Sequence, residues 1–261
     1  MTWLRGIFNL RKKESKWRDI RLRKALNYSV NREELWKYAA KGNAYNLGGI
    51  IPEGAFGHNP NLSPYPYDTE KARELLADAG YPKGFEVKLI ALEQLRVETQ
   101  IIANMLERIG LKVHYEILPD PEFWRKVNTV ILDKPAEEQE WDIHFFTVMD
   151  AYGHTGACLM PWNFIEESGI RWIEYDSVYE EMWQDMKRTV DLVAQEEKIR
   201  QMVRYLFEQD YALNIYTPIT LYAVNKEVNF VPYKNNMLNL METSVTDNHW
   251  SIGGESVRKI H

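Results

Sequence analysis

The chain has 261 residues, enough to bury a sizeable core as one large domain or two small ones. Its apolar share of 45%, its charged share of 27% and its net charge of −6 are those of a globular protein, and they argue against nucleic acid or an anionic membrane as the main partner. The 9 Trp and 15 Tyr are numerous enough to supply both a core and a surface that holds a ligand.

Three standard features are missing from the sequence. Cys158 is the single cysteine, so an internal disulfide is excluded. No window reaches the roughly 18 apolar residues that a membrane span requires, so direct membrane insertion is not expected. The first residues, MTWLRGIFNLRKKES, do not form a signal peptide, because Arg5 interrupts the apolar run and no small-residue cleavage site follows. As written, the chain is expected to stay in the cytoplasm.

The first third of the chain predicts one strand and three helices. The strand covers residues 6–10, and Ser15 is expected to cap the first helix. Residues 19–42 predict a helical hairpin, in which Asn31 and Glu34 form a capping box at the start of the second helix. A loop over residues 43–67 leads to Asp68, which is expected to cap a helix over residues 69–79.

The remainder predicts an alternating α/β pattern. A strand over residues 85–92, a helix over 98–109 and a strand over 111–118 predict a parallel pair of strands with a helical crossover. A helix that begins at Pro121 and a strand over residues 141–148 follow. After a loop over residues 150–173, Asp176 is expected to cap a long helix. A helix over 196–209 and a strand over 212–224, with Pro218 at an edge or a bulge, complete the pattern.

Two segments carry specific sequence motifs. Residues 19–33 are DIRLRKALNYSVNRE, and residues 67–85 are YDTEKARELLADAGYPKGF. Both resemble motifs of family 5 of the extracellular solute-binding proteins, the receptors of peptide and nickel ABC importers. Asn31 and Thr69 stand where the family more often has Asp and Pro, and both exchanges are compatible with a helix start.

The resemblance extends over residues 8–250 and implies an α/β fold, a periplasmic-binding-protein-like lobe with a mixed sheet and helices on its faces. Full-length members have two lobes joined by a hinge. This chain resembles the second, C-terminal lobe over residues 1–225, and residues 226–261 resemble the return segment toward a first lobe that the chain does not contain. Residues 217–233 correspond to the late strand that crosses back.

The resemblance implies a binding function. A solute, by preference an oligopeptide, would be captured for an ABC importer by closure of two lobes. No bond is made or broken, so we expect no enzyme activity and no cofactor. The expected partners are the solute and, in the full-length context, the transporter permease. The full-length protein would act in the periplasm or at the cell surface.

The loop after the strand at residues 141–148 is the expected ligand contact. In peptide-binding members an Asp in this loop pairs with the ligand's α-amino group, and Asp150 aligns best with it, although one residue closer to Asp142. The Trp and the Asp-Pro of the family's loop are absent. The expected ligand-binding residues are Asp150, Phe146, Tyr152, His154 and Trp162.

Each of these residues also has a purely structural interpretation. Asp150 could cap a turn, and one of Phe145 and Phe146 is expected in the core. Trp162 and Trp172 suit core packing and ligand contact equally. A sugar-like solute would use these aromatic rings as platforms, so a sugar-binding importer receptor is an alternative.

Other chemistry finds little support in the sequence. His144 and His154 flank the loop, but the six histidines do not have the spacing of a metal site, and no metal is expected. Cys158 is expected to be an inert thiol, and motifs of nucleophilic or phosphate-binding sites are missing.

A second alternative function is that of a cytoplasmic ligand-sensing domain of a bacterial regulator. A lobe without its partner is expected to bind peptides weakly or not at all and to self-associate through its exposed aromatic cleft face.

Overall fold

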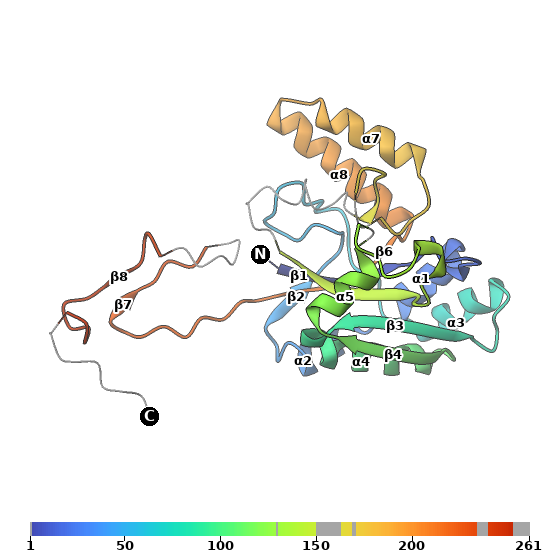
Figure 1. Cartoon of the computed structure of the whole chain (residues 1–261), viewed down its shortest axis with the longest axis horizontal. Helices are drawn as coiled ribbons and strands as arrows, with labels where there is room; N and C mark the ends of the chain where they lie inside the picture. The colour runs from blue at the N-terminus through green and yellow to red at the C-terminus, as the bar shows by residue number, and fades with distance from the viewer. Residues whose placement is uncertain (1, 129, 150–162, 169–170, 234–239, 253–261) are drawn as a thin grey trace.

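The computed structural model describes residues 2–128, 130–149, 163–168, 171–233 and 240–252 (Figure 1). At the centre of the molecule is a six-stranded sheet with the strand order β2-β6-β1-β5-β3-β4. The strands are β1 (Thr2–Phe8), β2 (Ala44–Asn46), β3 (Glu86–Leu92), β4 (Lys112–Leu118), β5 (Ile143–Met149) and β6 (Ala212–Pro218).

The sheet is mixed, as the resemblance implies. β3 is parallel to both β4 and β5, which confirms the predicted parallel pair. β1 is antiparallel to both of its neighbours, β5 and β6, and Thr2 lies opposite Met149. The short β2 adds an antiparallel strand at the other side of β6.

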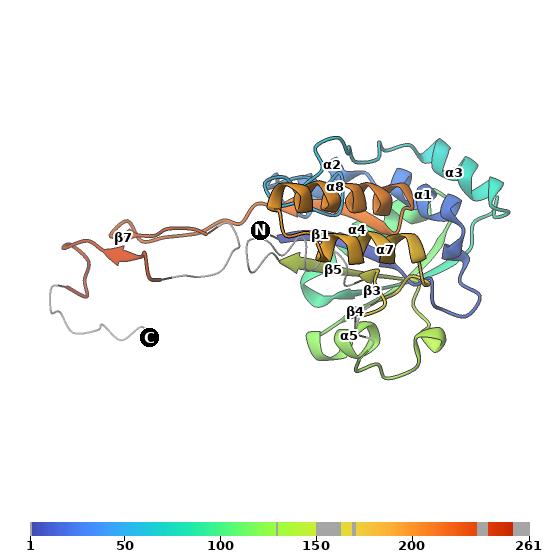
Figure 2. The same cartoon turned by 90° about the horizontal axis from the view of Figure 1, so that it is seen from above.

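Helices cover both faces of this sheet, with α1 and α4 on one face and α5 on the other (Figures 1 and 2). None of the helices within the described ranges is long and apolar enough to cross a membrane. The helices are α1 (Ile20–Ser29), α2 (Arg32–Tyr38), α3 (Thr69–Asp78), α4 (Arg96–Arg108), α5 (Asp120–Val127), α7 (Ser177–Lys187) and α8 (Leu192–Glu208), with short 3₁₀ turns at Lys16–Arg18, Glu93–Leu95 and Ala136–Glu138.

Side-chain caps fix where several helices begin. The predicted caps are confirmed, because each side chain accepts a hydrogen bond from the backbone N–H three residues on. Two further helices also begin at a capping Asp: Asp191 of α8 accepts from the N–H three residues on, and Asp19 of α1 accepts from that of Arg21, two residues on. The confirmed caps are Asn31 for α2, Asp68 for α3 and Asp176 for α7.

Two expectations about helix starts are wrong. The capping box is only half formed, because the Glu34 carboxylate pairs with Arg108 of α4 at 2.9 and 3.0 Å instead of returning to Asn31. Ser15 precedes the 3₁₀ turn at Lys16–Arg18 without capping it, because its hydroxyl donates to the carbonyl of Asn9 at 2.6 Å, and α1 begins after Asp19. In both cases a contact from outside the helix takes the side chain.

Two arginines of the motif at residues 19–33 hold the helical hairpin from inside the core, Arg23 through the turn that precedes β6 and Arg32 through β6 itself. Arg23 and Arg32 are 3% and 5% exposed, and each guanidinium donates to four main-chain carbonyls, which offset the loss of water around the charge. In this chain these two motif residues therefore have a structural role. The carbonyls belong to Trp17, Arg18, Gln209 and Asp210 for Arg23, and to Asn27, Val30, Tyr65 and Asn214 for Arg32.

Three predicted boundaries differ from the structure. β1 begins at Thr2 rather than at residue 6, because its first residues pair with the end of β5. β6 ends at Pro218 rather than at residue 224, because its neighbour β2 begins at Ala44, directly opposite Pro218. α8 begins at Leu192, four residues before the predicted start at Glu196.

One carboxylate fastens the α7–α8 hairpin to the body. Asp176 caps α7 and also accepts hydrogen bonds from the hydroxyls of Tyr205 on α8 and Tyr211, each at 2.9 Å. The two helices lie side by side (Figures 1 and 2). The turn between them exposes Val190, and the first turn of α8 exposes Leu192 and Val193.

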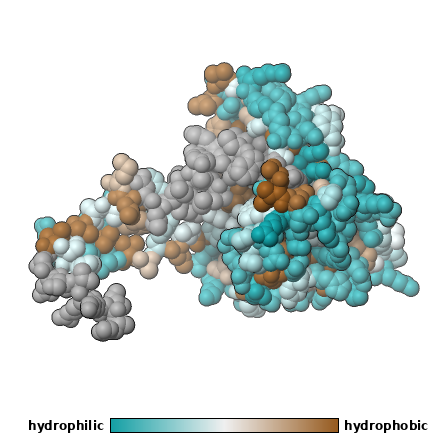
Figure 3. Space-filling view, viewed as in Figure 1, coloured by the Kyte–Doolittle hydropathy of each residue, from teal (hydrophilic) through white to brown (hydrophobic). Residues whose placement is uncertain are grey.

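Beyond Pro218 the chain leaves the sheet as an extended tail that carries β7 (Val228–Asn229) and β8 (Ser244–Val245) (Figure 1). Apolar side chains lie exposed along this tail, and Figure 3 shows them as a brown band. They include Leu221, Leu240, Met241, Trp250 and Ile252.

Candidate functional site

One edge of the sheet gathers the carboxyl ends of four strands. β3, β4, β5 and β6 all end there, and the antiparallel β1 begins there with Thr2 opposite Met149. The extended tail leaves from the same side (Figure 1). In open α/β sheets, ligands bind outside the carboxyl ends of the strands. This side of the sheet, here called the carboxyl edge, is therefore the candidate ligand-binding face.

Two polar pairs mark the described part of the carboxyl edge. Gln94, which is exposed, donates from Nε2 to Thr147 Oγ1 at 3.1 Å. The hydroxyl of Tyr216, on β6, donates to Glu98 Oε1 of α4 at 2.7 Å. Burial, together with this hydrogen bond, raises the pKa of Tyr216 above its ordinary value. The described part of the edge thus presents the exposed Gln94 amide, whereas the Tyr216 hydroxyl is buried and already donates to Glu98.

Most of the predicted ligand contacts lie outside the described residues, namely Asp150, Tyr152, His154 and Trp162. Phe146 is described, and the structure places it within the fold at 5% exposed. Its ring centroid lies 5.2 Å from that of His144 and 6.4 Å from that of Trp124. Phe145 is buried as well, so both rings of the pair are core rather than one.

Trp172 belongs to the core. It is 0% exposed, and its indole Nε1 donates to the carbonyl of Val127 at 2.7 Å. Its ring packs edge-to-face on Trp141 with the centroids 4.4 Å apart. Of the two interpretations that the sequence leaves open for this residue, the structure supports core packing.

Arg5, which in the sequence only interrupts an apolar run, is buried at the centre of β1 with 1% of its surface exposed. Its Cζ atom lies 5.2 Å from the ring centroid of Phe146 and 5.9 Å from that of Phe164. Nη2 donates to Asn163 Oδ1 at 2.7 Å, whereas Nε and Nη1 have no hydrogen-bond partner among the described residues. Arg5, His144, Asn163 and Tyr179 form what is here called the Arg5 cluster.

The charges of the Arg5 cluster are unusual for an interior. Burial lowers the pKa of Arg5 to about 9, which still leaves it a cation at neutral pH. Burial, and secondarily the charge of Arg5, lowers the pKa of His144 to about 3, so the imidazole is neutral. His144 Nδ1 and the Tyr179 hydroxyl also have no partner in the described ranges. No carboxylate of the described chain pairs with Arg5.

A metal site at His144 is not supported by its surroundings. The imidazole is 2% exposed and lies among the rings of Phe123, Trp141 and Phe146, while His154 lies outside the described residues. Within the described ranges, no group of three or more His, Cys, Asp or Glu side chains is placed to hold a metal ion.

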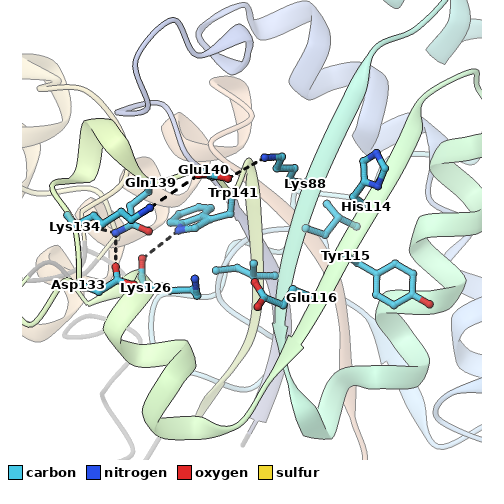
Figure 4. Close-up of a pocket in the computed structure, with 12 residues that line it drawn as sticks. Lys88, His114, Tyr115, Glu116, Lys126, Asp133, Lys134, Gln139, Glu140 and Trp141 are labelled. Carbon is cyan, nitrogen blue, oxygen red and sulfur yellow. Dashed lines mark hydrogen bonds and ion pairs between the residues drawn. The ribbon is translucent and has the colours of Figure 1, made fainter.

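A hollow of about 350 Å³ lies on the α5 face of the sheet, between the middle of β3 and β4 and residues 126–141 (Figure 4). Much of its polar lining is paired within the chain. Lys88 binds Glu140 at 3.0 Å, and the Trp141 indole N–H donates to the Lys126 carbonyl at 3.1 Å. Because this hollow lies along the strands rather than at their ends, the carboxyl edge is the better candidate.

Comparisons with known proteins identify the family of the chain. Residues 4–168, more than half of the chain, match the family model of the bacterial extracellular solute-binding proteins, family 5 Middle. The glutathione-binding protein GsiB of Salmonella typhi is 37% identical over 95 residues, which are 35% of this chain and 18% of the relative. The dipeptide-binding protein of Escherichia coli is 35% identical over 91 residues, 35% of this chain and 17% of the relative.

A solved structure extends the similarity to nearly the whole fold. The periplasmic binding protein AgaA of A. tumefaciens, in complex with agropinic acid, superimposes with a TM-score of 0.75 at 21% identity. The match covers 95% of this chain and 51% of that protein. The periplasmic-binding-protein fold is thus confirmed, and the proteins matched are binding proteins rather than enzymes. The chain spans about half of this neighbour and less than one fifth of the two curated relatives.

Proposed function

Since the chain belongs to family 5 of the bacterial extracellular solute-binding proteins, we propose that it supplies one lobe of a receptor that captures a peptide for an ABC importer. The observation that carries the proposal is the carboxyl edge, where four strand ends converge and where the tail departs. The two curated relatives are named for glutathione, a tripeptide, and for a dipeptide, which supports a short peptide as the solute.

The proposal assigns the body, residues 2–218, to the second lobe and the tail to the return toward a first lobe. The predicted return from residue 226 begins inside the extended tail. Leu240 and Met241 of this tail are 68% and 92% exposed, and such apolar side chains gain most when another lobe covers them. Left uncovered, they favour self-association through the tail, in addition to that through the cleft face, which the sequence predicts.

In this proposal the two lobes close about the segments that cross the carboxyl edge and enclose the peptide between them. The chain makes and breaks no covalent bond. The full-length receptor would work outside the cytoplasm, in keeping with the family's description as extracellular, and would deliver the peptide to a transporter permease.

The test is an NMR titration of the ¹⁵N-labelled chain with the dipeptide Ala-Leu, and with maltose in parallel. One lobe encloses only part of a ligand, so we expect a dissociation constant of about 1 mM or weaker. Amide signals at the carboxyl edge, those of Gln94, Thr147 and Tyr216, should shift with the dipeptide and not with the sugar.

A pair of variants locates the contact. Gln94→Ala should weaken the dipeptide response, whereas Gln100→Ala, at an exposed glutamine within α4, should not. Shifts that cluster around Lys88 and Glu140 instead would place the ligand in the hollow of Figure 4 and overturn the site. A response to maltose alone would replace the peptide by a sugar.

A further inference from the structure

The three most buried arginines of the body differ in how many hydrogen bonds their guanidinium groups make. Arg23 and Arg32 each donate to four main-chain carbonyls. Arg5 is buried at least as deeply, yet within the described ranges its five N–H groups make one hydrogen bond, to Asn163. The fold therefore satisfies two of these cations and leaves the third open to a further partner.

An unpaired cation in the interior is strongly unfavourable. The rings of Phe146 and Phe164 lie within 6 Å of the Arg5 guanidinium and compensate for part of the lost hydration through cation–π attraction. They leave its in-plane N–H groups unused. A group that binds those N–H groups must be an acceptor, and one that balances the charge must be an anion.

The rest of the Arg5 cluster has the same requirement. The Tyr179 hydroxyl can donate a hydrogen bond, and it has no partner among the described residues. Its ring lies 6.0 Å from that of Phe164, on which the guanidinium packs. A carboxylate has two oxygens that match the fork of a guanidinium and can accept from a hydroxyl at the same time.

The cluster also lies near the proposed ligand face. Arg5 is three residues from Thr2, the residue at which β1 meets the carboxyl edge, and it pairs across the sheet with Phe146. We propose that the Arg5 cluster binds a carboxylate of the ligand that is captured at the carboxyl edge. This inference rests on the proposed function and narrows its solute to a peptide or other small acid whose carboxylate reaches β1.

The test compares three dipeptides that differ in their carboxylate, by NMR titration of the purified chain. Ala-Ala has a free C-terminus, Ala-Ala-amide has none, and Ala-Glu-amide has a carboxylate only on its side chain. Removing one partner of a buried charge pair makes the binding free energy much less favourable. We therefore expect Ala-Ala to bind at least ~30-fold more tightly than its amide. If a side-chain carboxylate of the peptide can occupy the same position, Ala-Glu-amide should bind as tightly as Ala-Ala does.

Variants attribute this preference to Arg5. Arg5→Met should bind the acid and the amide equally. Arg11→Met, which removes the same charge from a residue that pairs with Glu137 near the opposite end of β1, should keep the wild-type preference. Equal binding of acid and amide by the wild-type chain would overturn the inference while leaving the proposed function intact.

A second measurement does not depend on peptide binding. Thermal unfolding is compared in sodium acetate and sodium chloride at equal ionic strength. Acetate should raise the midpoint of the wild-type chain and of Arg11→Met, but not that of Arg5→Met, which should be at least as stable as the wild type in chloride. No acetate effect in the wild type, together with a strongly destabilised Arg5→Met, would show that a carboxylate of the chain already pairs with Arg5. If no dipeptide binds, the proposed function fails, and the acetate response still shows whether the Arg5 cluster binds a carboxylate.

Discussion

The substitution Asp210→Asn should make the chain more stable at neutral pH. Asp210 is 1% exposed, directly after α8, and its backbone adopts a left-handed conformation with φ of +51°. Asn27 Nδ2 donates to its Oδ1 at 3.1 Å, while Oδ2 has no partner in the described part of the chain. Burial raises the pKa of Asp210 from 3.8 to about 6, against the nearby Tyr65 hydroxyl and the charges of Lys24 and Arg23.

The sign of the effect follows from the direction of this shift. The folded chain holds the proton of Asp210 more tightly than the unfolded chain does. The contribution of this group to the free energy of unfolding is therefore greatest below pH 3.8 and falls as the pH rises to about 6. A shift of that size corresponds to a loss of about 3 kcal/mol over the whole range, of which about 2 kcal/mol falls between pH 4.5 and pH 8.

Asparagine keeps the acceptor oxygen, suits the left-handed backbone and carries no charge. The free energy of unfolding of both chains is measured with urea at each pH. The value for the variant minus that for the wild type should therefore be about 2 kcal/mol more positive at pH 8 than at pH 4.5. Asp78→Asn, at an exposed carboxylate, serves as the control and should show little difference between the two pH values. An equal effect of Asp210→Asn at both pH values would refute the reasoning, because Asp210 would then titrate as an exposed acid does.

Three further predictions concern stability and use urea unfolding. Arg32→Met should lower the free energy of unfolding by about 3 kcal/mol or more, because it leaves buried carbonyls unpaired, whereas the exposed Arg204→Met should change it little. Gly84→Ala should destabilise the chain more than Gly80→Ala, although both glycines have positive φ. Only at Gly84 would the new Cβ collide with a backbone carbonyl, so Gly80→Ala should cost only about 1 kcal/mol. Tyr211→Phe should cost about 1–2 kcal/mol, because it removes a hydrogen bond to the carboxylate that caps α7; no loss would mean that the bond does not hold the hairpin.

Local features were predictable from the sequence. The caps at Asn31, Asp68 and Asp176 depend on a bond to a backbone N–H only three residues away, so a short motif is sufficient to find them. The alternation of strands and helices likewise predicted the parallel β3–β4 pair. The family motifs identified the fold because they cover two of these local units.

Features that depend on distant partners were not predictable. Glu34 left its capping box because Arg108, on another helix, competes for the carboxylate. Arg5 resembled a break in an apolar run, because the rings that enclose it, Phe146 and Phe164, lie about 140 to 160 residues further along the chain. A charged residue such as Arg5 indicates a buried polar site only when its segment is known to be a central strand of the sheet.

The position of β1 beside β6 has a practical consequence for moving this fold between proteins. The chain enters the body at Thr2 and leaves it at Pro218, on adjacent antiparallel strands that are spaced about 5 Å apart. A host needs only one surface loop with closely spaced ends to accept residues 2–218 as an insertion, and its own termini need not move. The body is thus suited to insertion into a loop of an unrelated reporter protein, whose signal would then respond to ligand binding at the carboxyl edge.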